Sequence, residues 1–158
     1  MSEVNPHHAA PCGLYCGVCK IHIATLEGDL AYLRRLARIY RRRFPQISSL
    51  PSDQLLCDGC LSPRRFPSCE QCSIRECAQQ RGLQGCCACA DFPCDLVDRF
   101  PMPVGRKVIL RAVPYWREHG MQAWAIAEKR RYHCPECGHA LFRGARQCER
   151  CGSAVNVD

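Results

Sequence analysis

The sequence predicts a small metal-stabilised protein, irregular with α-helices, that ends in a β-hairpin zinc ribbon. Cysteine accounts for 16 of the 158 residues, and it recurs along the chain in C-x-x-C pairs. The hydrophobic fraction of 47% includes those cysteines, so few apolar residues remain for a domain stabilised by packing alone. Metal–thiolate sites would supply the missing folding free energy.

Composition also narrows the setting of the protein. No apolar run approaches the ~18 residues of a membrane span, and the opening MSEVNPHHAAPC carries no apolar signal-peptide segment. We therefore expect a cytoplasmic protein without a membrane partner, in which cysteine pairs indicate metal or redox chemistry before disulfides. No sequence signature of a hydrolase, a metalloprotease or a phosphate-binding loop is present, so an enzyme is the less favoured interpretation.

The formal net charge of +7 invites a nucleic-acid interpretation. If all the thiols ionise around four divalent ions, however, the net charge falls to about −1. Much of the basicity is then countercharge for thiolates, and it is weak support for a polyanionic partner.

The first cysteine group has a C-x3-C-x2-C spacing and consists of Cys12, Cys16 and Cys19. Three thiolates need a fourth ligand, which we expect from the cysteines of residues 77–94. A site of three cysteines and one histidine is the alternative, with the histidine drawn from His7, His8 or His22. The same spacing occurs around the iron–sulfur cluster of radical enzymes that use S-adenosylmethionine, but this chain is too short for their barrel.

A helix is predicted between Cys19 and Cys57, with Thr25 as its N-cap and Pro45 at its end. Its apolar face would comprise Leu26, Leu30, Leu33, Ala37, Tyr40 and Phe44. The opposite arc carries Arg34, Arg35, Arg38, Arg41 and Arg42. This arc is either a solvated face or a surface for an anionic partner, and the absence of interleaved exposed aromatics favours the solvated face.

The middle of the chain holds two more cysteine groups. Cys57, Cys60, Cys69 and Cys72 form a C-x2-C-x8-C-x2-C pattern, which predicts one shared site, or else two pairs that each join cysteines elsewhere. The five cysteines that follow are Cys77, Cys86, Cys87, Cys89 and Cys94. Together with the first group they provide ligands for two further sites. Because adjacent residues rarely reach one ion together, we expect either Cys86 or Cys87 to remain unbound.

Helical patterns also extend over residues 74–80, 95–100, 104–118 and 121–131. The stretch FPMPVG is typical of a hinge, Pro114 should kink the third helix, and His119-Gly120 separates the last two. Trp116 and Trp124 are expected to anchor these helices in the core. The predicted organisation is a cysteine-rich domain at 10–100, a helical connector at 101–131 and a ribbon at 132–158.

The C-terminal cysteines give the most specific pattern. Cys134, Cys137, Cys148 and Cys151 follow a C-x2-C-x10-C-x2-C spacing, and Gly138 and Gly152 come directly after the two pairs. Glycine there permits the left-handed backbone that closes a zinc knuckle. Residues 139–143 would form one rib of a hairpin, with Gly144 at its turn. The sequence predicts a closed, structural Zn²⁺ site, with rubredoxin-like iron as the competitor on ligand grounds.

The first hundred residues contain five motifs in this order: CGLYCGVC at 12–19, IAT at 23–25, CDGC at 57–60, CSIRECA at 72–78 and CADFPC at 89–94. In this order they resemble the cysteine-rich domain-of-unknown-function family 3795 of bacteria and archaea. The resemblance implies metal binding by the shared cysteines and names no reaction. It covers roughly residues 12–100, and the Cys86-Cys87 doublet departs from the single cysteine expected there.

Three functions follow as hypotheses. The first is a non-catalytic zinc protein with structural four-cysteine sites, which acts as an adaptor or regulator through contacts with another protein. The second is a redox protein with [4Fe–4S] clusters on the N-terminal cysteines. The third is nucleic-acid binding through the ribbon and the arginine-rich helix.

Overall fold

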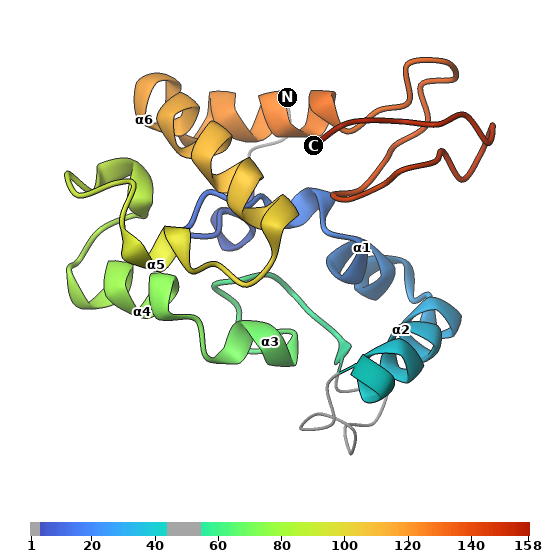
Figure 1. The fold of residues 1–158 in the computed structure, drawn as a ribbon, viewed down its shortest axis with the longest axis horizontal. Coiled ribbons are helices and arrows are strands. Elements are labelled where there is room, and N and C mark those ends of the chain that lie inside the picture. The colour runs from blue at the N-terminus through green and yellow to red at the C-terminus, as the bar shows by residue number, and fades with distance from the viewer. Residues whose placement is uncertain (1–3, 44–54) are drawn as a thin grey trace.

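Helices and loops make up almost the whole protein in the computed structural model, which describes residues 4–43 and 55–158 (Figure 1). The 3₁₀ helices described are η1 (Pro6–His8), η2 (Cys16–Val18) and η5 (Cys86–Ala88). The α-helices are α1 (Lys20–Glu27), α2 (Leu30–Arg43), α3 (Pro67–Glu70), α4 (Ser73–Gln80), α5 (Asp95–Asp98) and α6 (Pro103–Arg131).

The predicted helical content is therefore confirmed, but the predicted β-hairpin is not. Within the described ranges there are no strands, and antiparallel pairing consists of isolated bridges. Two of these bridges, His133–Ala140 and Gln147–Ala154, lie in the C-terminal segment. Each bridge joins the residues that flank one C-x-x-C pair. The turn at each cysteine pair is therefore closed by a single bridge, without extended strands.

The single helix predicted from Thr25 to Pro45 is wrong, because the chain breaks it at Gly28. Gly28 adopts a left-handed φ of 67° and ends α1, and the Asp29 carboxylate accepts a hydrogen bond from the Tyr32 N–H at the start of α2. The break separates residues that one helix would have placed on a common face. Leu26 is 67% exposed, whereas Leu33 is fully buried.

The other predicted members of that face divide in the same way. Leu30 is exposed and Ala37 is buried. Of the predicted arginine arc, Arg34, Arg35, Arg38 and Arg42 are exposed, as a solvated face requires. The side chains of Tyr40 and Arg41, and the residues Phe44 and Pro45, lie outside the described part of the chain.

The later helices follow the sequence pattern more closely. α4 matches the predicted 74–80 helix, and α5 ends two residues before the predicted boundary. The two predicted helices after the FPMPVG stretch run together as α6, whose backbone leaves helical geometry at Gly120 (φ 81°, ψ 168°) and not at Pro114. The stretch itself is packed, because Gly105 lies against the Phe100 ring and Arg106 pairs with Asp98 at 2.7 Å.

Aromatic rings form the centre of the larger core. The indole rings of Trp116 and Trp124 stack with centroids 4.5 Å apart, and the Tyr15 ring meets Trp124 edge-on at 5.7 Å. The two tryptophans are 2% and 0% exposed, so their predicted role as anchors is confirmed. Leu141 of the C-terminal segment joins the same cluster. Residues from all three predicted segments thus share one core, while the segment boundaries remain a prediction.

A second, smaller core lies under α1 and α2. Ala24 and Leu33 pack there with Leu55, Cys57 and Phe66 from the segment that follows residue 54. This packing brings the CDGC motif against α1. No helix in the described residues is long and apolar enough to cross a membrane.

Candidate metal centres

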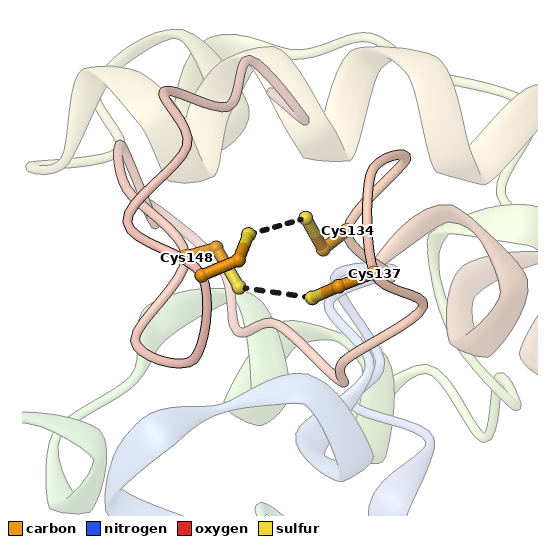
Figure 2. A group of neighbouring side chains, drawn as sticks. Cys134, Cys137 and Cys148 are labelled. Atoms are coloured by element: carbon orange, nitrogen blue, oxygen red, sulfur yellow. Dashed lines mark hydrogen bonds between the residues drawn. The ribbon is translucent and has the colours of Figure 1, made fainter.

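The four cysteines after α6 converge on one point. The Sγ atoms of Cys134 and Cys151 lie 3.6 Å apart, and those of Cys137 and Cys148 lie 3.7 Å apart (Figure 2). All four Sγ atoms are within 4.8 Å of one another. A tetrahedral ion with Zn–S bonds of about 2.3 Å separates its sulfurs by about 3.8 Å. This group, the C-terminal cluster, can therefore bind a metal ion.

The cluster is built from two turns of the same kind. The N–H of Gly138 donates to the Cys134 carbonyl at 2.8 Å, and the N–H of Gly152 donates to the Cys148 carbonyl at 3.0 Å. Both glycines have positive φ angles, 69° and 75°. A side chain at either position would strain the turn, so the glycine that follows each cysteine pair is a geometric requirement.

The thiols of this cluster differ in pKa. Hydrogen bonds from the Ser153 hydroxyl and backbone N–H lower the pKa of Cys151 to about 6. The His139 N–H lowers the pKa of Cys137, but burial and the neighbouring thiols outweigh it and raise that pKa to about 12. One exposed sulfur is therefore already ionised at neutral pH and is available as a first ligand.

Four cysteines from the middle of the chain form a second assembly, which we call the middle group: Cys77, Cys86, Cys89 and Cys94. The Cys89 N–H donates to the Cys86 carbonyl at 3.1 Å, which closes the turn of η5. Burial, followed by the nearby Cys94, Cys89, Cys77 and Cys87 thiols, raises the pKa of Cys86 to about 12. These thiols thus lie close enough for their charges to interact.

The structure separates the two members of the cysteine doublet. Cys86 faces the middle group, whereas Cys87 is 8% exposed and packs in the larger core beside α6. Burial raises the pKa of Cys87, and no other thiol contributes to that shift. By solvent exposure Cys87 is the more buried member of the pair, and which of the two remains unbound stays a prediction.

The remaining cysteines form a third assembly, the seven-cysteine group. Its members are Cys12, Cys16, Cys19, Cys57, Cys60, Cys69 and Cys72. The Cys60 N–H donates to the Cys16 Sγ at 3.4 Å, which joins the first motif to the CDGC motif. Burial raises the pKa of Cys12 well above its usual value, and the nearby Cys60 and Cys72 thiols add to the rise.

This arrangement differs from the favoured sequence interpretation. We expected Cys57, Cys60, Cys69 and Cys72 to share one site, and the first group to take a ligand from residues 77–94. The structure places the first group near the CDGC and CEQC cysteines, which are also near one another, so the division of these thiols into sites stays a prediction. Sequence spacing could not distinguish these pairings, because the contacts that decide them join residues up to 44 positions apart.

The first twelve cysteines are less tightly gathered than the C-terminal four. Among the described residues, the C-terminal cluster is the one group whose ligand atoms all lie within 4.8 Å of one another. The seven-cysteine and middle groups are therefore wider assemblies of neighbouring thiols. Because their sulfurs lie farther apart than those of the C-terminal cluster, these groups could suit a different metal.

Arginines lie beside each N-terminal assembly. Arg81 donates from Nη1 to the Cys89 Sγ at 3.2 Å, and Arg117 donates from Nε to the Cys87 carbonyl at 2.8 Å. Burial raises the pKa of Cys60, and Arg75, which is 5% exposed and donates to the carbonyls of Cys69 and Glu70, opposes that rise. These cations lie where they could compensate the charge of ionised thiols.

A fourth arginine reaches the seven-cysteine group from the C-terminal segment. Arg143 donates from Nη2 to the Tyr15 carbonyl at 2.6 Å, and its backbone N–H donates to the Val18 carbonyl at 2.9 Å. The positive charge lowers the pKa of Cys12 and of Cys16 against the larger effect of burial. The sequence analysis did not identify this residue, and only the position of Arg75 inside the CSIRECA motif signalled any of the four.

Two predicted ligand histidines are occupied by other contacts. His7 donates from Nδ1 to the Leu61 carbonyl at 3.2 Å, and His8 Nε2 accepts from the Asn5 side chain at 3.4 Å. Burial lowers the pKa of His8 to about 4, so its ring is neutral. The third, His22, is 1% exposed and donates from Nδ1 to the Cys57 carbonyl at 2.8 Å.

Comparison with known proteins supports the resemblance stated above. No curated protein and no solved structure is significantly similar to the chain. Residues 8–99 match the family described as "Protein of unknown function (DUF3795)", and this match includes the first twelve cysteines. With more than half of its length inside that match, the chain belongs to the DUF3795 family.

Proposed function

We propose that the protein is a zinc-binding protein with structural thiolate sites, and that it acts as a non-catalytic adaptor or regulator. The observation that carries this proposal is the closed geometry of the C-terminal cluster. Its sulfurs have the separations of a tetrahedral Zn²⁺ site, and a fourth protein ligand leaves no coordination position open for a substrate.

The way this cluster is connected to the rest of the protein supports a structural role. Cys134 and Cys148 are both buried in the larger core, together with Trp124 and Leu141. An ion here would hold the C-terminal segment against α6. Free energies of structural zinc sites are on the order of 10 kcal/mol, which is comparable to the whole stability of a small domain.

The proposed partner is another protein. The elbow between α1 and α2 exposes the apolar side chains of Leu26 and Leu30, which lie beside the charged arginine face of α2. A mixed apolar and basic surface of this kind suits a protein contact better than a nucleic acid, which would also use exposed aromatics.

An iron–sulfur protein is the second candidate, and the spacing of the N-terminal thiols favours it. A four-iron cluster holds its thiolates farther apart than a single ion does. The seven-cysteine and middle groups do not bring their sulfurs within the 4.8 Å that the C-terminal cluster satisfies. On this proposal the N-terminal half would hold [4Fe–4S] clusters while zinc remained in the C-terminal cluster.

One preparation distinguishes the two candidates. The protein is purified without oxygen, its visible spectrum is recorded, and zinc, iron and acid-labile sulfide are measured per chain. A colourless protein with about four zinc ions supports the zinc proposal. Brown absorbance with about four sulfides per cluster supports the iron–sulfur candidate and overturns an all-zinc protein.

A further inference from the structure

The seven-cysteine group is one ligand short of two complete sites. Tetrahedral zinc sites of the structural kind have four protein ligands each, so two sites need eight. We do not take Cys87 as the eighth ligand, because it is buried in the core beside α6 and none of the seven thiols contributes to its pKa shift. A residue other than cysteine must complete the set if the proposed zinc function holds.

His22 has the burial and the free atom that such a ligand requires. The side chain is 1% exposed, and its Nε2 has no hydrogen-bond partner. Buried polar atoms without a partner are rare, and a missing ion is one of their recognised explanations. The unpartnered atom is also of a ligand type that zinc prefers.

The other ring nitrogen fixes the tautomer. Nδ1 lies 2.8 Å from the Cys57 carbonyl, and a carbonyl can only accept, so Nδ1 carries the hydrogen. Nε2 of the neutral ring then presents its lone pair. Histidines that bind metals are held in this state, with one nitrogen donating to a carbonyl and the other on the ion.

The backbone also places His22 one helical turn from Cys19 and against the backbone of Cys57. Cys19 is the N-cap of α1, and His22 follows it by three residues, so both lie on one side of the first turn. On the same helix, the Thr25 hydroxyl accepts from the Cys57 N–H at 2.9 Å. His22 and Thr25 therefore hold both backbone groups of Cys57 against α1.

Of the three histidines near this group, His22 is the one with a buried nitrogen left over. His7 is exposed and donates to the Leu61 carbonyl, and His8 Nε2 accepts from Asn5. The His8 ring packs edge-on against the His22 ring with centroids 4.4 Å apart. This contact restricts the orientation of the His22 ring.

We propose that His22 Nε2 binds a zinc ion together with Cys19, Cys57 and Cys69, whose ligand atoms lie farther apart than those of the C-terminal cluster and would close around the ion. This site, which we call the mixed site, leaves a neighbouring four-cysteine site made of Cys12, Cys16, Cys60 and Cys72. That division agrees with the Cys60 N–H that donates to Cys16 Sγ. On binding, the three thiols of the mixed site lose their protons to solvent, while the neutral imidazole loses none.

The test compares metal content among His22 variants of the full chain. The wild type is expected to bind about four zinc ions, and His22→Ala about three. His22→Cys restores a fourth ligand and is expected to return the count to the wild-type value. His7→Ala is the matched control, since it removes an exposed neighbouring imidazole and should leave the count unchanged.

A measurement on the wild type covers the case in which His22→Ala does not fold. In protein loaded with ¹¹³Cd²⁺ and labelled with ¹⁵N-histidine, the His22 Nε2 signal should be split by coupling to the metal. An Nε2 signal without coupling, or an unchanged zinc count in His22→Ala, overturns the proposal.

The inference rests on the proposed zinc function, but the two can fail separately. Iron and sulfide in the wild-type protein overturn the zinc function, whatever the variants do. Zinc in all four proteins at equal stoichiometry leaves the zinc function standing and overturns His22 as a ligand.

Discussion

The C-terminal cluster and the seven-cysteine group assemble thiols in opposite ways. In the C-terminal cluster, each cysteine pair is closed by its own backbone turn, and the two turns face each other across a short connection. In the seven-cysteine group, thiols from the start of the chain meet thiols that follow residue 56. Local spacing therefore determines the first arrangement, whereas tertiary packing determines the second.

This difference has an energetic consequence. A site formed by local turns needs few distant contacts, so its loss should affect a limited part of the chain. A site that gathers distant segments closes long loops, and its ion compensates for the larger loss of chain entropy. The structural effect of removing one ligand should therefore spread farther from the seven-cysteine group than from the C-terminal cluster.

The largest expected effect comes from Cys148→Ser compared with Cys69→Ser. Each variant should lose one ion and on the order of 10 kcal/mol of local stabilisation. Metal analysis and hydrogen–deuterium exchange measure the result. In Cys148→Ser the new exchange should be strongest over residues 132–158, whereas in Cys69→Ser it should reach both α1 and α4. Equal patterns in the two variants would contradict the comparison.

The Cys86-Cys87 doublet allows a second test, in which the expected effect is smaller. Cys86→Ser should lose one ion per chain, because Cys86 lies among the other thiols of that group. Cys87→Ser should retain every ion and lower the free energy of unfolding by roughly 1–3 kcal/mol, the cost of placing a hydroxyl in a buried position of the core. Metal analysis and a denaturant titration measure the two quantities, and ion loss from Cys87→Ser instead would reverse the assignment.

Arg143 belongs to the C-terminal segment, but its side chain lies beside the thiols of the seven-cysteine group. Its removal should therefore affect that group and not the C-terminal cluster. Arg143→Met takes a positive charge from beside Cys12 and Cys16, and we expect metal affinity in the seven-cysteine group to fall about 10–100-fold. The affinity of the C-terminal cluster should hold. Competition with a coloured chelator measures both affinities, and Arg146→Met, an exposed neighbour, is the control. A uniform loss at both sites would indicate a general structural defect.

The smallest effect concerns the order in which thiols react. After brief chelation, Cys151 should be alkylated first, because its pKa is about 6 and it is exposed. Its rate should fall as the pH drops through about 6, since the thiolate is then protonated. Cys69 and Cys86 should react slowly at neutral pH, because burial raises each pKa to about 12. Mass spectrometry of alkylated peptides gives the order, and excess Zn²⁺ should suppress the reaction.

Several features could be predicted from the sequence because they depend on short spacings. The C-x-x-C pairs with their following glycines predicted the C-terminal cluster, the helical pattern predicted α4, and the His119-Gly120 pair predicted the break at Gly120. The burial of the two tryptophans was predicted from the apolar pattern of their helices. In each case the residues that decide the structure are neighbours along the chain.

Other features could not be predicted in this way. Gly28 divides the first long helix, although the apolar periodicity continues through it, because a left-handed residue ends a helix whatever the pattern of its neighbours. The expected ribs of the hairpin are reduced to isolated bridges, since the knuckle turns and their contacts with the core already fix the C-terminal segment.

The sequence alone determined that this protein is rich in thiol ligands, that its last four cysteines face one another, and that it resembles its family. Only the tertiary structure brought Cys60 beside Cys16, His22 beside the Cys57 carbonyl and Arg143 beside the first cysteine group. The physical reason is that a turn fixes the distance between residues a few positions apart, whereas segments separated by dozens of residues are brought together by the core they share.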